Sequence, residues 1–460
     1  MKLLDLKKEA GELHPANTEN RINGVKDNAV APASQEQNLP EIYFDTGRNQ
    51  YLSCDTRGGW IPYNETQIKR LLRAAGVSPN KPEGAHVSPL DRHLIHLMQD
   101  RGVHYAGMLA GYTSGIYEME GRRILVTESP RLLNPLSGDW PVLRQFFKGL
   151  LDDPEHDQLA YFLGWLKIAV ESLHAGSIRP GQVLAIAGPR DCGKSLAQKI
   201  ITEILGGRSA KPYQYMAGLT SFNSDLFTAE HLTIEDDIGS TDMRARRNFG
   251  EQIKAFSVNE SHRCHPKNRE AITLKPFWRV SITLNDEPES MMILPPLDSS
   301  IEDKIILLRA RKNPLPMPTG TLEQRKAFWA AITAEIPAFL HDLTQNAIPD
   351  NIQGERFGIG HFHHPELLQA LNELSPESKL LQIIDAVLFS GPLAGTWEGS
   401  VARLEQELRS SNYRQETDKL LSFSQACGRY LSRLEKQYPN RISKTHTREG
   451  NLWIINPIVL

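Results

Sequence analysis

Residues Val183–Ser195 read V-L-A-I-A-G-P-R-D-C-G-K-S, and this stretch decides the fold of the chain around it. Its first five residues are apolar and predict a short strand that is buried on both faces. The run breaks at Gly188-Pro189, and Gly193-Lys194-Ser195 then opens a helical pattern of apolar residues. Strand, loop and helix in this order are the context in which G-x-x-x-x-G-K-[ST] binds phosphate.

The chemistry of this loop explains its residue types. Glycines let the backbone N–H groups curl around phosphate oxygens, and the start of the following helix adds partial positive charge. We expect Lys194 to bridge the β- and γ-phosphates and the Ser195 hydroxyl to ligate Mg²⁺. A glycine turn that matches by chance is the weaker alternative. The predicted nucleotide-binding residues are Gly188, Pro189, Arg190, Asp191, Cys192, Gly193, Lys194 and Ser195.

A second apolar run, Leu232-Thr-Ile, ends in three acids, Glu235-Asp236-Asp237. In a nucleotide hydrolase one such carboxylate holds Mg²⁺ and a neighbour polarises the attacking water. We predict Asp236 and Asp237 for these roles, with Asp236 and Ser195 on the metal, and Glu235 as the alternative member of the pair. A solvated acidic turn is the weaker interpretation, because three adjacent acids repel one another without a shared cation.

A third β-run, Trp278–Leu284, ends on the uncharged Asn285. An amide at the carboxyl end of a central strand lies on the ligand-binding edge of such a sheet. Asn285 is therefore predicted to position the attacking water and to sense the γ-phosphate. Its alternative is a turn residue, because Asn-Asp-Glu-Pro is turn chemistry.

A basic loop lies between these strands. Pro266-Lys267-Asn268 predicts a hairpin tip, and Lys267, Arg269 and His265 are predicted to contact a phosphate backbone. An ordinary solvated turn is the alternative. The nearby His and Cys residues lack the second ligand pair that a structural zinc site needs.

Composition limits the class of protein. The chain has 460 residues, 40% hydrophobic and 23% charged, which predicts a globular protein of two to four domains. The sequence has neither an apolar run long enough to span a bilayer nor a signal-peptide pattern at its start, and the four cysteines are scattered. We therefore expect no membrane association, reduced thiols and a cytoplasmic location. A net charge of −3 means that any contact with nucleic acid is local.

The periodicity and the breaks along the chain predict six segments. They are a flexible tail (1–40), a small α/β domain (41–142), a helical collar-like segment (143–179), the nucleotide-binding core (180–316), a helical lid or linker (317–375) and a winged-helix domain (376–460).

The last segment is read as three helices followed by two alternating strands, which is the winged-helix pattern. Six cations of its third helix and wing predict a phosphate-contacting face, with protein contact as the alternative. They are Arg429, Arg433, Lys436, Arg441, Lys444 and Arg448.

The four motifs, in this order, resemble those of the superfamily 3 helicases, the AAA+ ring motors of small DNA viruses, phages and plasmids. The layout is most similar to the helicase part of the phage, plasmid and poxvirus-type primase-helicase proteins. The motif match covers about residues 143–316. The resemblance implies an α/β fold: an AAA+ P-loop core with a parallel central sheet, preceded by a small α/β domain and a helical segment and followed by a winged helix.

The resemblance also implies a homo-oligomeric ring, a hexamer in this family, that hydrolyses ATP with Mg²⁺ at subunit interfaces and moves on single-stranded or forked DNA. Lys267 would touch DNA in the channel. The family places an arginine finger where this chain has Lys304, which supplies the charge but not the bidentate fork. Arg309 or Arg311 are alternatives. No primase domain is recognisable, so a separate primase or initiator protein is an expected partner.

We therefore predict an ATP-dependent DNA helicase or translocase of a phage, prophage or plasmid replication system. The alternative is a DNA-sensing or DNA-remodelling ATPase, in mobile-element control or phage defence, that does not unwind processively. A third hypothesis is an origin-binding scaffold that uses nucleotide only to assemble. A small-molecule kinase is disfavoured, because it would have no use for the basic hairpin and the winged helix.

Overall fold

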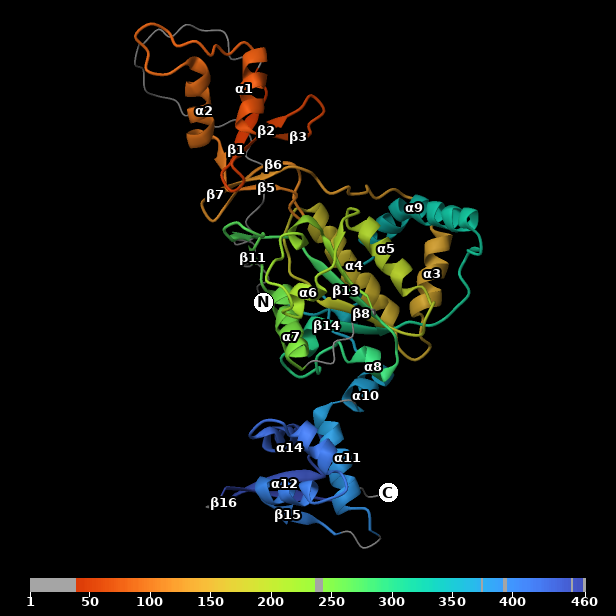
Figure 1. Ribbon diagram of the computed structural model, residues 1–460. Coiled ribbons are helices and arrows are strands. Elements are labelled where there is room, and N and C mark those ends of the chain that lie inside the picture. Colours follow the sequence, from red (N-terminus) through yellow and green to blue (C-terminus); the bar gives the residue numbers. More distant parts are fainter. Residues whose placement is uncertain (1–38, 236–242, 374, 392–394, 448–449, 458–460) are drawn as a thin grey trace, which may run out of the picture. The chain divides into compact units, whose positions relative to one another are not determined.

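The computed structural model describes residues 39–457, apart from 236–242, 374, 392–394 and 448–449 (Figure 1). The chain divides into two compact units, one of Met1–Asn285 with Leu297–His363 and one of Asp286–Pro296 with His364–Leu460. Of the predicted tail, 1–40, all but the last two residues lie outside the described part.

The centre of the first unit is a five-stranded parallel sheet, as predicted. Its strands lie in the order β14-β8-β13-β10-β9. Every residue of β8, β10 and β13 is buried, because both faces of the sheet are covered, and this includes polar residues such as Arg279 and Ser281 of β13. The strands are β8 (Val183–Ala187), β9 (Ser209–Ala210), β10 (His231–Ile234), β13 (Arg279–Leu284) and β14 (Ile305–Arg309).

One apolar cluster joins this sheet to its helices and includes Phe147, Phe162 and Phe339. The predicted helical segment 143–179 forms two helices, one ending at Leu151 and one beginning at Gln158. Pro154 lies in the break between them and disfavours a continuous helix. The second is capped by Asp157, whose side chain accepts a bond from the Ala160 N–H. From α3 onward the α-helices of this unit, within the described residues, are α3 (Pro141–Leu151), α4 (Gln158–His174), α5 (Lys194–Ile204), α6 (Tyr213–Met216), α7 (Met243–Val258) and α9 (Leu322–Gln345).

The chain before α3 forms two small sheets and two helices. The first sheet has the order β3-β2-β1-β4, and the second has the order β5-β7-β6. The start of α1 is fixed by a capping box between Asn64 and Gln67. The elements are β1 (Ile42–Asp45), β2 (Gln50–Cys54), β3 (Trp60–Tyr63), α1 (Glu65–Ala74), α2 (Pro89–Asp100), β4 (Gly102–Val103), β5 (Tyr105–Gly107), β6 (Gly115–Met119) and β7 (Arg122–Val126).

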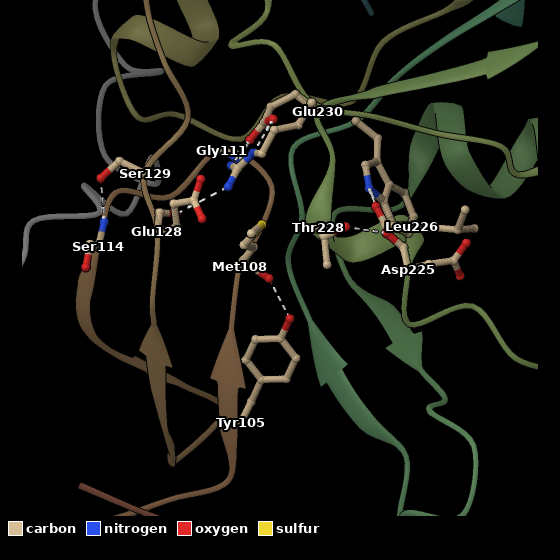
Figure 2. Close-up of polar contacts among 12 residues, drawn as sticks. Tyr105, Met108, Gly111, Ser114, Glu128, Ser129, Asp225, Leu226, Thr228 and Glu230 are labelled. Atoms are coloured by element: carbon tan, nitrogen blue, oxygen red, sulfur yellow. Dashed lines mark hydrogen bonds and ion pairs between the residues drawn. The ribbon is translucent and has the colours of Figure 1, made fainter. Parts of the chain in front are cut away.

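A buried ion pair ties this small part to the central sheet (Figure 2). Glu230, just before β10, is 0% exposed and accepts two bonds from the Arg208 guanidinium, one of them from Nε at 2.9 Å. Its Oε1 also accepts the Gly111 N–H at 2.8 Å. Arg208 in turn donates to the carbonyl of Glu128, between β7 and α3. The carboxylate is therefore shared by both parts of the unit.

The backbone continues this junction. The Ala110 N–H donates to the carbonyl of Phe227, and the Ala110 carbonyl accepts the Phe277 N–H at 2.9 Å. Gly111 has φ +84°, and a Cβ there would lie 2.5 Å from that of Phe277. The segment therefore needs glycine both for its backbone angle and for its close approach to the core.

The second unit has helices and a three-stranded sheet of order β15-β17-β16 around one apolar cluster. Sequence reasoning predicted three helices and the β16–β17 pair but missed α13 and the three-residue β15. Its elements are α8 (Pro288–Met291), α10 (Pro365–Glu373), α11 (Pro376–Leu388), β15 (Trp397–Gly399), α12 (Val401–Arg409), α13 (Arg414–Leu420), α14 (Ala426–Gln437), β16 (Ile442–Thr447) and β17 (Gly450–Ile455).

Carboxylates neutralise half of the six cations predicted to contact phosphate in this unit. Arg433 pairs with Glu377, Arg441 with Asp385, and Lys444 with Glu435 at 2.6 Å. Arg448 lies outside the described residues. The basic face is thus less charged than its sequence suggests.

In the described part of the chain, no helix combines the length and apolar character needed to cross a bilayer. All four cysteines lie in described segments and are free thiols.

Candidate nucleotide and nucleic-acid site

The predicted phosphate loop connects β8 to α5 and has the backbone angles that such a loop requires. Asp191 has φ 56° and Gly193 has φ 106°, both in the left-handed region, and α5 begins directly afterwards at Lys194. A Cβ at Gly193 would lie 3.1 Å from the Phe146 ring of α3. The turn therefore bends tightly at the start of the helix, where backbone N–H groups point outward.

The Lys194 ammonium lies at the centre of this loop. It is 8% exposed, and its Nζ donates to the carbonyls of Gly188 at 2.7 Å and Pro189 at 2.8 Å. The Asn285 Oδ1 accepts a further bond from it at 3.3 Å. All three acceptors are neutral oxygens, and no carboxylate among the described residues bonds to the ammonium. A buried cation without a counter-charge is a strong attractor for an anion.

The order of the strands brings three of the predicted motifs together. Because β13 lies between β8 and β10, Asn285 stands between the phosphate loop and Glu235, the residue after β10. All three follow the carboxyl ends of parallel strands, the edge where open α/β sheets bind ligands. Asp236 and Asp237 lie outside the described residues.

Oxygen ligands for Mg²⁺ are present at this edge. Ser195 is exposed in the first turn of α5, and the half-buried Glu235 follows β10, two strands along the sheet from β8. Hydroxyl and carboxylate oxygens are the donors that a hard cation prefers, so these residues fit the predicted ion. Glu235 pairs with Lys211 at 3.5 Å, a contact that sequence reasoning did not find. Among the described residues no group of three or more His, Cys, Asp or Glu side chains could hold a metal ion.

Gly188 is glycine because the chain after β14 crosses directly over it. A Cβ at this position would lie 2.4 Å from the Ala310 carbonyl oxygen and 2.8 Å from the Ala310 Cβ. The Ala310 N–H donates to the Ala187 carbonyl at 2.7 Å, which holds the two chains together.

Gly188→Ala is therefore expected to push the phosphate loop away from the end of β14. Overpacking of this kind costs about 1–3 kcal/mol; if the nucleotide-binding conformation of the loop bears this cost, ATP binding becomes about 5- to 150-fold weaker. Titration of a fluorescent ATP analogue measures the change. Gly395→Ala is the matched control, because nothing lies within 4 Å of a Cβ there. Equal affinity in the two variants would show that the crowding is harmless.

The predicted basic hairpin is present as β11 (His262–Cys264) and β12 (Ile272–Leu274). Asn268 at its tip has φ 60°, and Lys267 and Arg269 beside it are exposed. Arg269 also faces the first sheet: burial raises the pKa of the Asp45 carboxyl, and the charges of Arg48 and Arg269 oppose this rise.

His265 has a different environment from the two cations. The His265 backbone N–H donates to the Asn223 Oδ1 at 2.7 Å, and the centroid of the His265 ring lies 5.2 Å from that of the Phe222 ring. These contacts fasten the hairpin tip to the loop before η2 (Leu226–Thr228). Phe222 is 41% exposed, so an aromatic face adjoins the basic tip. Sequence reasoning missed Phe222, although an isolated aromatic in the polar run Thr220–Ser224 is a signal that could have marked it.

The structure does not bring Lys304 to the phosphate loop. Lys304 ends the 3-10 helix η3 (Glu302–Lys304) before β14, whereas the loop follows the far end of the neighbouring β8. Five residues of strand separate these edges by roughly 16 Å. Arg309 and Arg311 lie at the other end of β14, and the Arg311 N–H donates to the Leu150 carbonyl at 2.8 Å.

The chain shares its fold with a solved protein. No protein-family model and no curated protein matches it. Two apo structures of the NrS-1 C-terminal region each cover 91% of this chain and 96% of their own, with TM-scores of 0.52 and 0.51 and identities of 13% and 12%. A third structure, described as SCCmec type IV Cch, active helicase, covers 87% of this chain and 73% of its own at 10% identity. Its TM-score of 0.31 is too low to indicate a shared fold. The likeness to the NrS-1 region therefore concerns the fold, over nearly the whole chain.

Proposed function

We propose that this protein is an ATP- and Mg²⁺-dependent DNA helicase or translocase of the superfamily 3 type. The observation that carries the proposal is the buried Lys194 ammonium, held by the loop carbonyls and by Asn285 at the carboxyl edge of a parallel sheet. This site suits a polyphosphate whose γ-phosphate is bonded by Lys194 and sensed by Asn285. The order of the motifs and the shared fold support the same class.

In this proposal each residue has a defined task. The phosphate-loop N–H groups and Lys194 bind the triphosphate, and Ser195 and Asp236 would hold Mg²⁺, which would supply positive charge to the phosphates. Asp237, or Glu235, orients the attacking water together with Asn285. Lys194 must exchange its carbonyl contacts for phosphate oxygens when ATP binds, so binding reorganises the loop.

The nucleic-acid contact of the proposal is the hairpin tip. Lys267 and Arg269 supply cations for the phosphate backbone, and the exposed Phe222 offers a face on which a base can stack. We propose a homo-oligomeric ring, hexameric by resemblance, whose subunits place this tip on a single strand. The last segment is proposed to be a winged helix, and its paired cations favour a protein contact there over DNA.

Lys267→Ala is expected to weaken binding to single-stranded DNA several-fold and to lower the salt slope of binding by about 1, because one phosphate contact is lost. ATP hydrolysis without DNA is expected to stay unchanged. Lys326→Ala, an exposed lysine on α9, is the matched control. Fluorescence anisotropy of a labelled oligonucleotide across a salt series makes the measurement. A salt slope equal to that of the wild-type chain would show that Lys267 does not contact DNA.

A DNA-remodelling ATPase remains the second candidate function, because the geometry of the nucleotide site is the same for both. Strand displacement on a forked duplex separates them. The helicase proposal predicts ATP-dependent release of the labelled strand. Hydrolysis that DNA stimulates without any strand release would favour remodelling.

A further inference from the structure

A buried amide ties the helix of the phosphate loop to two strands of the central sheet. Gln198 lies on α5 one turn after Lys194, on the same face of the helix, and is 3% exposed. Its Nε2 donates to the Ile234 carbonyl at 3.2 Å, to the Ser281 carbonyl at 3.2 Å and to the Ser281 hydroxyl at 3.0 Å. Its Oε1 accepts the Thr283 hydroxyl at 3.3 Å. One side chain of α5 therefore bonds to β10 and β13 at once.

A closed ring of bonds fixes the direction in which each group of this network donates. The Thr202 hydroxyl donates to the Gln198 carbonyl at 3.0 Å, so it accepts from the His231 Nδ1 at 2.7 Å. His231 is 0% exposed, and burial lowers the pKa of its ring to about 3, so the neutral ring carries its proton on Nδ1. The unprotonated Nε2 accepts the Ser281 hydroxyl at 2.8 Å, and that hydroxyl accepts the Gln198 amide. Each donor has an acceptor, and the network carries no charge.

This network determines where α5 lies more than how firmly it is attached. Apolar residues of α5 such as Ala197 and Ile201 pack in the same core as β8, but hydrophobic contact has no direction and leaves a helix free to slide along the strands. Bonds from one amide to two strands are directional and fix the position of the helix. Their contribution to stability is small, because apolar groups of the same shape can replace both partners of a hydrogen bond at little cost.

The elements that Gln198 joins carry the oxygen ligands predicted for Mg²⁺. Ser195 lies three residues earlier on α5. Ile234, whose carbonyl accepts the amide, is the last residue of β10 and directly precedes Glu235 and the acids that follow it. The bonds of Gln198 therefore set the separation between the hydroxyl on one element and the carboxylates after the other.

We infer that Gln198 is a positioning residue, which holds α5 and β10 at the spacing that lets Ser195 and the acids after β10 share one Mg²⁺ ion. The inference rests on the proposed function. Because a Mg²⁺ site needs near-ideal octahedral geometry with oxygens at about 2.0–2.1 Å, a small shift of either element weakens it. The triphosphate alone does not depend on this spacing, since Lys194 and the N–H groups that bind it belong to the loop and the start of α5.

Two variants of Gln198 test the inference through nucleotide binding, without any need for hydrolysis. Gln198→Met keeps the length of the side chain and removes its hydrogen bonds, and Gln198→Asn keeps the amide on a stem one carbon shorter. In EDTA, both are expected to bind a fluorescent ATP analogue as tightly as the wild-type chain does. The tightening that added Mg²⁺ produces is expected to be about tenfold smaller in both, as when a metal site loses an outer-shell contact.

Thr202→Val is the matched control, measured with the others below the unfolding temperature of each chain. It removes a hydroxyl of the same network and leaves the His231 Nδ1–H without its acceptor, but it does not alter the bonds from Gln198 to the strands. It is expected to lower the midpoint of thermal unfolding and to keep the full effect of Mg²⁺.

The outcomes separate the inference from the proposed function. Full tightening by Mg²⁺ in either Gln198 variant, or an equal loss in Thr202→Val, would make Gln198 a structural residue only and overturn the inference. A wild-type chain that binds the analogue no more tightly with Mg²⁺ would also overturn it. A wild-type chain that does not bind the analogue at all would overturn the proposed function, and the inference with it.

Discussion

A Lys194→Ala chain is expected to lose ATP hydrolysis by at least about 10²–10³-fold, because the substitution removes the charge that faces the γ-phosphate as it leaves. The effect is large because the ammonium is buried and the oxygens that accept its bonds within the described residues are neutral, so its charge is not cancelled there. Release of inorganic phosphate under saturating ATP and Mg²⁺ measures the loss.

The matched control for this prediction is Lys199→Ala. Lys199 belongs to the same helix α5, but its Nζ lies 3.7 Å from the centroid of the Trp329 ring rather than in the phosphate loop. Turnover of the control is expected to stay near that of the wild-type chain. If Lys194→Ala hydrolysed ATP as fast as Lys199→Ala, the nucleotide site would have to lie elsewhere.

Arg208→Ala is expected to lower the free energy of unfolding by about 3–5 kcal/mol, the cost of leaving one charge of a buried pair without its partner. Glu230 is fully buried, and among the described residues its carboxylate accepts, beyond the guanidinium bonds, a single bond from the backbone N–H of Gly111. Because the Glu230 carboxylate links the small sheets before α3 to β10, Arg208→Ala is expected to destabilise both parts of the unit together. Chemical denaturation followed by tryptophan fluorescence measures the change.

Two further variants test the physical cause. Glu230→Gln in the Arg208→Ala background removes the stranded charge and is expected to recover part of the lost stability. Lys69→Ala breaks an exposed pair with Glu65 on α1 and is expected to cost less than about 1 kcal/mol. A loss in Arg208→Ala as small as that in Lys69→Ala would mean that water or another cation reaches Glu230.

The features that sequence reasoning located well are those in which chemistry and local pattern coincide. Gly193 needs a left-handed backbone, Lys194 follows it at the start of a helix, and Asn285 directly follows a β-run, so each is visible within a few neighbouring residues. The buried central strand follows from the continuous apolar run of β8, whereas β13 alternates polar and apolar residues and its burial on both faces is not visible in the sequence.

The features it missed depend on contacts between distant segments. Ala310 dictates glycine at position 188, Lys211 pairs with Glu235, and Arg356 reaches Asp303 across 53 positions. None of these three contacts follows from a periodicity or a motif, because each is created by the path of the chain in space. The carboxylate partners of Arg433, Arg441 and Lys444 in the second unit could not be predicted for the same reason, since the charges are visible in sequence and the pairings are not.

The central claim is that hydrolysis at the Lys194 site is coupled to a DNA strand held by the Lys267 hairpin. The most direct measurement is steady-state ATP hydrolysis with and without single-stranded DNA, with Lys194→Ala as the blank. The account predicts Mg²⁺-dependent hydrolysis that single-stranded DNA stimulates several-fold, and a smaller stimulation in Lys267→Ala. Hydrolysis that DNA leaves unchanged, or no hydrolysis above the blank, would contradict it.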